Sequence, residues 1–239
     1  HHNAFTNMVQ ELLDAKDTIF PENYLTLSEK KQVAILSEIK GAIDPSIFSD
    51  EMLVKTLQSI QAIKEIQYRN GKRGANRYII SNNQTALNVM QTFAMLNLSG
   101  FGDVLPVDVI PLFETVDDLQ NAASVMRTLY TNTAYRKHVN QRKDKQTIML
   151  GFSDGTKDGG YLMANWSIFK AKEELTAISR EFGIEVIFFD GRGGPPARGG
   201  GKTHQFYASL GPTIEDKEIQ LTIQGQTISS NFGTLSSSQ

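Results

Sequence analysis

From Arg77 onward, short β-rich runs alternate with longer segments of helical periodicity. The runs are rich in β-branched and aromatic residues and comprise Tyr78–Ile80, Val107–Phe113, Thr147–Phe152 and Ile184–Phe189. Helical patterns follow them, and the longest, Leu162–Phe182, ends at Gly183, a residue type that often terminates helices. Strands that alternate with helices in this way predict βαβ units, and hence a parallel sheet or barrel.

Residues 3–76 show only helical patterns. Three helices are expected there: Asn7–Leu13, a segment from the capping-box pair Thr26 and Glu29 to Gly41, and a segment from Ser49 to Asn70. We interpret His1 and His2 as the remnant of an affinity tag, residues 3–76 as a helical region and residues 77–239 as a β/α region. The β/α region ends with two short extended segments, Glu218–Thr222 and Gln226–Ser230.

The composition narrows the class of protein. Of the 239 residues, 40% are hydrophobic and 21% are charged, which is typical of a folded globular chain. The net charge of −2 gives no general attraction to nucleic acids or anionic membranes, and no apolar run approaches the ~20 residues that span a bilayer. The absence of cysteine excludes disulfides, thiolate metal ligands and cysteine nucleophiles. We therefore expect a cytoplasmic protein with no nucleic-acid or membrane partner.

Polar residues follow the predicted strands, and in parallel α/β folds ligands bind at the carboxyl ends of strands. Glu114 follows the second run, and Asp154 follows the third. Two carboxylates on neighbouring strand ends suit magnesium, which takes one or two carboxylates and completes its shell with water and substrate oxygens. Lys157 is close enough in sequence to serve the same pocket as a cation for an anionic substrate. The alternative is that these residues are helix caps and surface charges.

A glycine-rich segment follows the fourth run. Six of the eleven residues from Gly191 to Gly201 are glycine, and Arg192, Arg198 and Lys202 carry positive charge. Glycine lets the backbone approach an anion, and arginine binds phosphate or carboxylate through two parallel hydrogen bonds. The spacing matches neither a Walker loop nor a dinucleotide fingerprint. A disordered RNA-binding tract is the alternative, although this segment has no repeats and no interleaved aromatic residues.

Several motifs in this part of the chain occur in a specific order. They are VIPLFET at 109–115, MLGFSDGTKDG at 149–159, FDGRGG at 189–194, RGGG at 198–201 and LTIQGQ at 221–226. In this order they resemble phosphoenolpyruvate carboxylase over residues 77–239, with the helical region corresponding to the family's preceding part. The resemblance implies an α/β fold that contains part of a TIM-like (β/α) barrel, with additional helices and a helical N-terminal region.

The resemblance also implies a metal site and a reaction. Glu114 and Asp154 match the two carboxylates that hold the catalytic Mg2+ or Mn2+ in the family, and Lys157 matches an active-site lysine. The implied reaction is the metal-dependent carboxylation of phosphoenolpyruvate with bicarbonate, which yields oxaloacetate and phosphate. Phosphoenolpyruvate and bicarbonate are therefore the expected small-molecule partners.

The glycine-rich segment carries the residues that the resemblance assigns to the substrate. Arg192, with Gly193 and Gly194 beside it, matches the arginine that binds the phosphate of phosphoenolpyruvate, and Arg198 matches an arginine implicated in catalysis. Family members usually have a histidine, implicated in binding bicarbonate, where this chain has Asp190, which we count among the catalytic positions. A carboxylate there would repel bicarbonate unless it is protonated or bound to a metal.

Two histidines lie outside the N-terminal pair. His138 belongs to the basic stretch Arg136-Lys137-His138 and is expected on a solvated helix face. His204 follows the glycine-rich segment and is the only candidate to stand in for the family's histidine.

Members of the family are several times longer than this chain and are built around an eight-stranded barrel. We therefore expect a cut piece of a larger enzyme, or a degenerate paralogue, with no carboxylase turnover by itself. A partial barrel exposes sheet edges, so we expect self-association, and the full-length family enzyme is expected to be a homo-oligomer. Two other functions stay open. One is a barrel enzyme for another phosphorylated or carboxylated three-carbon acid, and the other is a non-catalytic module that binds anions or RNA through the glycine-rich segment.

Overall fold

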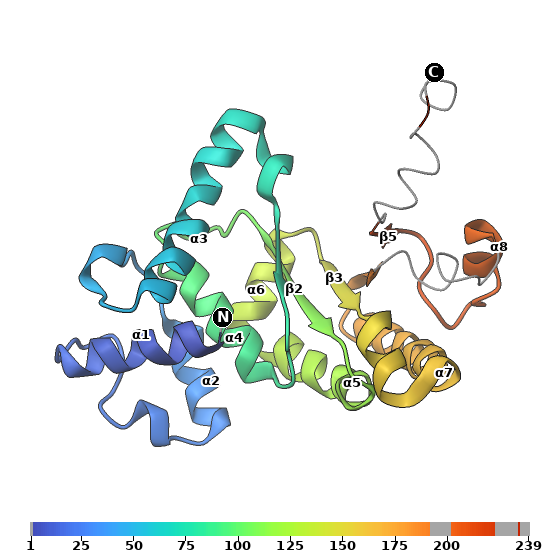
Figure 1. Cartoon of the computed structure of the whole chain (residues 1–239), viewed down its shortest axis with the longest axis horizontal. Coiled ribbons are helices and arrows are strands. Elements are labelled where there is room, and N and C mark those ends of the chain that lie inside the picture. Colours follow the sequence, from blue (N-terminus) through green and yellow to red (C-terminus); the bar gives the residue numbers. More distant parts are fainter. Residues whose placement is uncertain (1, 192–201, 223–233, 235–239) are drawn as a thin grey trace. The chain divides into compact units, whose positions relative to one another are not determined.

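The computed structural model describes residues 2–191, 202–222 and 234, and the side chains of these residues except 2 and 152–159. The chain forms two compact units (Figure 1). Unit 1 comprises His1–Pro111 and Val125–Asp144, and unit 2 comprises Leu112–Ser124 and Lys145–Gln239. Strand β2 (Asp108–Phe113) and helix α5 (Val116–Thr131) each begin in one unit and end in the other.

Unit 1 is mainly helical. Its elements are α1 (His2–Asp14), the 3-10 helix η1 (Tyr24–Thr26), α2 (Glu29–Glu38), η2 (Pro45–Ile47), α3 (Glu51–Asn70), η3 (Lys72–Ala75), β1 (Arg77–Ile80), α4 (Ala86–Asn97) and α6 (Thr133–Gln141). Helix α4 is the buried centre of this unit, because most of its residues are apolar and α1 and α2 pack against it. It begins with a capping box between Thr85 and Asn88.

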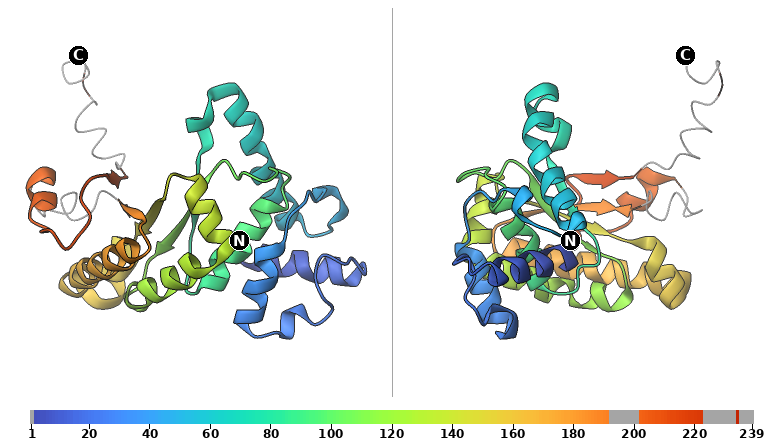
Figure 2. Two further views of the ribbon diagram at one scale, coloured as in Figure 1. Left: turned by 180° about the vertical axis from the view of Figure 1, so that it is seen from behind. Right: turned by 60° about the vertical axis from the view of Figure 1, so that its left-hand side comes forward.

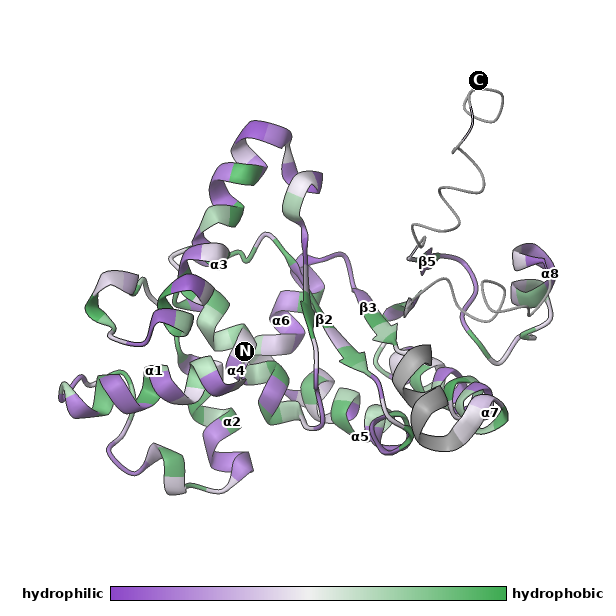
Figure 3. Cartoon of the chain, in the orientation of Figure 1, coloured by the Kyte–Doolittle hydropathy of each residue, from purple (hydrophilic) through white to green (hydrophobic). Residues whose placement is uncertain are grey.

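Unit 2 contains most of the strands. Its further elements are β3 (Lys145–Leu150), α7 (Phe152–Glu181), β4 (Glu185–Asp190), α8 (Thr203–Ala208) and β5 (Ile219–Leu221). Helix α7 is long and packs against β4 (Figure 2). Strand β2 is coloured as hydrophobic along most of its length in Figure 3, because every residue after Asp108 is apolar and buried.

The strands pair in parallel in the order β1-β2-β3-β4-β5. The predicted α/β class is therefore confirmed. The predicted TIM-like barrel is not confirmed, because the described strands form an open sheet with β1 and β5 at its ends. Barrel closure needs eight strands in this fold type, and the described residues supply five.

Two helix starts differ from the sequence prediction. Helix α2 has Ser28 at its N-cap, because Thr26 belongs to the preceding 3-10 helix η1. Helix α3 has Asp50 at its N-cap, where one carboxylate oxygen accepts a hydrogen bond from the Leu53 N–H at 2.6 Å, and Ser49 lies outside the helix. In both cases two nearby residues favour a cap, and the local backbone decides which of them takes the position.

Helix α7 differs most from its prediction. It begins at Phe152, so residues 153–158, which lie before the predicted helix, form its first turns. Gly160 has the non-helical angles φ 79° and ψ 168° and interrupts the helix close to the predicted start at Leu162. The second extended segment, 226–230, lies outside the described residues. Within the described part of the chain, no helix is long and apolar enough to cross a membrane.

Candidate active site

The carboxyl ends of β2, β3 and β4 lie side by side in unit 2. Phe113 pairs with Leu150, and Leu150 pairs with Asp190, so the chain leaves the three strands at neighbouring positions. The Gly151 N–H donates a hydrogen bond to the Phe113 carbonyl oxygen at 2.8 Å. A Cβ atom at Gly151 would lie 3.2 Å from the Glu114 Cα, so glycine permits this close approach. Three of the predicted site segments therefore start from one edge of the sheet.

Glu114 is the first residue after β2 and is half-buried. The following helix α5 is capped by Thr115 and Asp118. The Asp118 carboxylate accepts a hydrogen bond from the Thr115 N–H at 3.0 Å, and the Asp118 N–H donates to the Thr115 Oγ1 at 3.1 Å. This reciprocal pair is a capping box. The helix-cap role that the sequence left open for Glu114 is therefore filled by its two neighbours.

Asp154 and Lys157 lie in the first turns of α7, which begins directly after Gly151. The helix that carries Asp154 therefore starts beside the end of β2, while the side chains of Asp154 and Lys157 are outside the described part. The predicted substrate-binding residues also lie outside the described residues: Arg192, Gly193, Gly194 and Arg198.

The donor chemistry at this edge fits a hard divalent cation. Glu114 offers a carboxylate directly after β2, and the sequence places a second acidic residue, Asp154, shortly after β3. The described side chains contain no cluster of three or more histidine, aspartate or glutamate residues that could hold a metal ion. Magnesium commonly binds through one or two carboxylates together with water and substrate oxygens, so it does not require such a cluster. The metal site therefore stays a prediction, and the residue types at this edge are compatible with it.

Asp190, the last residue of β4, is buried, with 1% of its surface exposed. Its Oδ2 accepts hydrogen bonds from the Lys172 Nζ at 2.7 Å and from the Tyr207 hydroxyl at 2.5 Å. Lys172 is 2% exposed, so a buried ion pair neutralises the carboxylate. Burial raises the pKa of Tyr207 above its ordinary value, and the charge and hydrogen bond of Asp190 raise it further, so the phenol stays a donor. The predicted repulsion of bicarbonate made exceptions only for a protonated or metal-bound carboxylate, and the ion pair with Lys172 is a third way in which the charge is offset.

Lys172 and Tyr207 were not identified from the sequence. Lys172 does leave a signal, because it lies four residues after Ile168 and three before Leu175, both of which are buried on α7. A lysine at a core position of an amphipathic helix needs a buried acidic partner. Tyr207 leaves no comparable signal, since the short helix α8 has no clear apolar periodicity.

His138 is buried, and its predicted position on a solvated helix face is wrong. Tyr135, His138 and Val139 form the buried stripe of α6, and the His138 ring lies 5.4 Å from the Phe93 ring, centroid to centroid. Burial, and then the positive charge of Arg142, lower the pKa of His138 to about 4, against a smaller opposing effect of Asp108. His204 is exposed on α8.

The family model for phosphoenolpyruvate carboxylase matches residues 1–238. The chain belongs to this family. It is 36% identical to the phosphoenolpyruvate carboxylase of Nitrosomonas europaea over 97% of its own length, and 34% identical to that of Corynebacterium diphtheriae over 96%. It covers 26% of each of these relatives, so the chain spans about a quarter of their length. The resemblance inferred from the motifs is confirmed.

Proposed function

We propose that this chain contributes metal-binding and substrate-binding residues to a phosphoenolpyruvate carboxylase, a carbon–carbon lyase that forms oxaloacetate. The observation that supports this most is the adjacency of the ends of β2, β3 and β4, because the family's motif residues follow these three ends. The chain covers a quarter of the relatives' length, and in a protein of that length the parallel strands would form part of a larger barrel. A cytoplasmic homo-oligomer is the corresponding expectation for such a protein.

Glu114 and Asp154 would hold Mg2+ or Mn2+ at this edge. When bound, the cation would supply positive charge that offsets the charge developing on the substrate's oxygen atoms. Glu114 is suited to this role because it is half-buried and follows β2 directly, and a carboxylate at the end of a buried strand is held in place by the sheet.

Lys157, Arg192 and Arg198 would bind and orient the anionic substrates. The Arg192 guanidinium matches the geometry of a phosphoryl group, and the glycines at 193 and 194 let backbone N–H groups approach the same anion. An oxygen of bicarbonate attacks the phosphorus of phosphoenolpyruvate, which yields carboxyphosphate and the enolate of pyruvate. Carboxyphosphate then breaks down to carbon dioxide and phosphate. The enolate carbon attacks carbon dioxide and forms oxaloacetate.

Manganese binding tests the proposal on the chain itself. We expect water-proton relaxation to show Mn2+ bound by the parent chain, and phosphoenolpyruvate to change the relaxivity of the bound ion. Glu114→Gln removes one of the two carboxylates, so we expect its Mn2+ affinity to fall at least about tenfold. The matched control is Asp117→Asn, because Asp117 is an exposed carboxylate in the first turn of α5. Equal Mn2+ affinity in the parent and Glu114→Gln would contradict the metal assignment.

A further inference from the structure

Lys172, Asp190 and Tyr207 form a buried polar cluster, which we call the Asp190 cluster. The Asp190 Oδ2 accepts from both the Lys172 Nζ and the Tyr207 hydroxyl. The Lys172 Nζ also lies 5.4 Å from the centroids of the Phe188 and Tyr207 rings, within the range of cation–π attraction. The cluster therefore joins strand β4 to helices α7 and α8 through one carboxylate oxygen.

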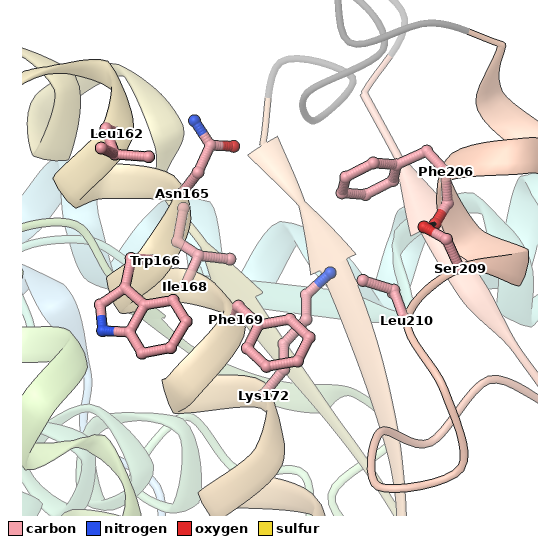
Figure 4. A pocket seen from close by; sticks show the side chains of 9 residues that line it. All are labelled: Leu162, Asn165, Trp166, Ile168, Phe169, Lys172, Phe206, Ser209 and Leu210. Carbon is pink, nitrogen blue, oxygen red and sulfur yellow. Dashed lines mark hydrogen bonds between the residues drawn. The ribbon is translucent and has the colours of Figure 1, made fainter.

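The surroundings of this cluster are largely apolar. Figure 4 shows Lys172 reaching from α7 toward the α8 side, with Phe169 beside it and Leu210 opposite. These residues line a cavity of about 360 Å³ between the two segments. The residues that pair with Asp190 on the neighbouring strands, Leu150 and Leu221, carry no charge. In such an environment the orientation of a carboxylate is determined by its few polar partners.

The cluster lies where the chain leaves β4. The Asp190 carbonyl oxygen accepts a hydrogen bond from the Thr222 N–H at 3.4 Å, so the backbone of this residue is held from the β5 side as well. A Cβ atom at Gly191, the next residue, would lie 3.1 Å from the Leu150 carbonyl oxygen, so glycine permits the close approach of this backbone to β3. Gly191 directly precedes Arg192, the proposed phosphate-binding residue.

We propose that Lys172 and Tyr207 are positioning residues of the carboxylase site, which hold Asp190 and thereby determine where the chain enters the segment that carries Arg192. The inference rests on the proposed function. It assigns to Asp190 a role that differs from contact with bicarbonate, because its Oδ2 is engaged by α7 and α8 and its Oδ1 is buried away from solvent. The pair Lys172–Asp190 gives little net stability, since an apolar pair of similar volume often stabilises a fold equally well. Unlike an apolar pair, the ion pair and its hydrogen bonds fix the orientation of Asp190 at the end of the strand.

Two variants and one control test this role in the full 239-residue chain. Tyr207→Phe removes one hydrogen bond and keeps both the aromatic ring and the Lys172–Asp190 ion pair. The double variant Lys172→Met with Asp190→Asn removes both charges, so that no unpaired charge is left buried. Lys145→Met is the control, because Lys145 pairs with Glu185 at 2.7 Å and with Glu218 at 3.1 Å at the opposite ends of the same strands.

The readout is the split between metal affinity and phosphoenolpyruvate affinity, both measured by water-proton relaxation of Mn2+. We expect Mn2+ affinity to stay within about twofold of the parent in all variants, because Glu114 and Asp154 are unchanged. We expect the affinity of the Mn2+-loaded chain for phosphoenolpyruvate to fall about tenfold in Tyr207→Phe, and further in the double variant. The scale is taken from residues that orient metal ligands, whose loss costs about 10–100-fold. Lys145→Met should bind phosphoenolpyruvate as the parent does.

The outcomes separate this inference from the proposed function. If the parent binds phosphoenolpyruvate and both cluster variants bind it equally well, the inference is overturned and the proposed function stands. Metal and phosphoenolpyruvate affinities that fall together also overturn the inference, because they indicate a general loss of structure. Circular dichroism verifies folding, and if the double variant does not fold, Tyr207→Phe decides. A parent that binds Mn2+ but no phosphoenolpyruvate refutes the proposed function, and the inference with it.

Discussion

Burial decides what the ionisable residues of this chain can do. Asp190 follows a predicted strand and is counted among the catalytic positions from the sequence, but it is the last residue of β4, buried and ion-paired with Lys172. His138 lies in a basic stretch, but its ring is enclosed by aromatic neighbours on α4 and α6. The partners of Asp190, and Phe93 beside His138, come from other elements. Residue type alone therefore predicts which ionisable groups are available, but not whether each group is buried, paired or charged.

His138 should make stability depend on pH. The pKa of about 4 in the folded chain lies below the ordinary value of 6.5, so between these values the unfolded chain binds a proton that the folded chain does not. The free energy of unfolding should therefore decrease as the pH falls from 6.5 to 4. From pH 7.5 to pH 5 we expect His138 to contribute a loss of about 2 kcal/mol.

Urea unfolding of the parent and of His138→Phe at both pH values measures this contribution. Phenylalanine keeps an aromatic ring against Phe93 and removes the titrating group. The parent should lose about 2 kcal/mol more than the variant between the two pH values, since all other groups titrate in both proteins. The same pH dependence in both proteins would show that His138 is not the responsible group.

At the scale of elements, the start of helix α3 shows how one of two possible residues becomes the N-cap. Asp50 and Ser49 are both good N-cap residues, and the sequence does not separate them. The structure does, because the two carboxylate oxygens of Asp50 accept from the Leu53 N–H at 2.6 Å and from the Asn7 Nδ2 at 2.8 Å. Asp50 thus caps α3 and also ties its start to α1. This second contact favours Asp50 over its neighbour.

Alanine substitutions should distinguish the two residues. Asp50→Ala removes the cap and the contact with α1, so we expect it to lower the free energy of unfolding by about 1–2 kcal/mol. Ser49→Ala is the matched control and should cost less than about 0.5 kcal/mol, because Ser49 is exposed outside the helix and alanine keeps the backbone N–H that donates to Glu11 at 2.6 Å. Urea titration at neutral pH measures both effects. An equal loss of unfolding free energy in the two variants would contradict the assignment of Asp50 as the N-cap of α3.

At the scale of the whole molecule, the open sheet and the exposed apolar residues are the main features. The described strands end at β1 on one side and at β5 on the other. On α7, Leu162 and Trp166 are 82% and 57% exposed. Exposed sheet edges and large exposed apolar side chains promote association with other chains. The chain covers about a quarter of its relatives' length, so in a protein of that length other segments would be available to cover these surfaces.

We expect the isolated chain to self-associate at micromolar concentrations for this reason. Multi-angle light scattering after size exclusion should give a mass clearly above 26.6 kDa, the mass of one chain, and the mass should fall on dilution. The doubly polar variant Leu162→Ser with Trp166→Ser should associate less if α7 contributes to the contact. A monomeric mass for the parent across the micromolar range would contradict this expectation.

The sequence by itself determined the alternation of strands and helices, the α/β class and the family. These follow from the spacing of apolar residues and from motifs that are continuous in the chain, such as those around Glu114 and Asp154. Only the tertiary structure decided that Lys172 and Tyr207 bind Asp190 and that His138 is buried. The reason is physical: the protonation state and hydrogen bonds of a side chain depend on neighbours brought close by packing, and the partners of Asp190 are 18 and 17 residues away along the chain.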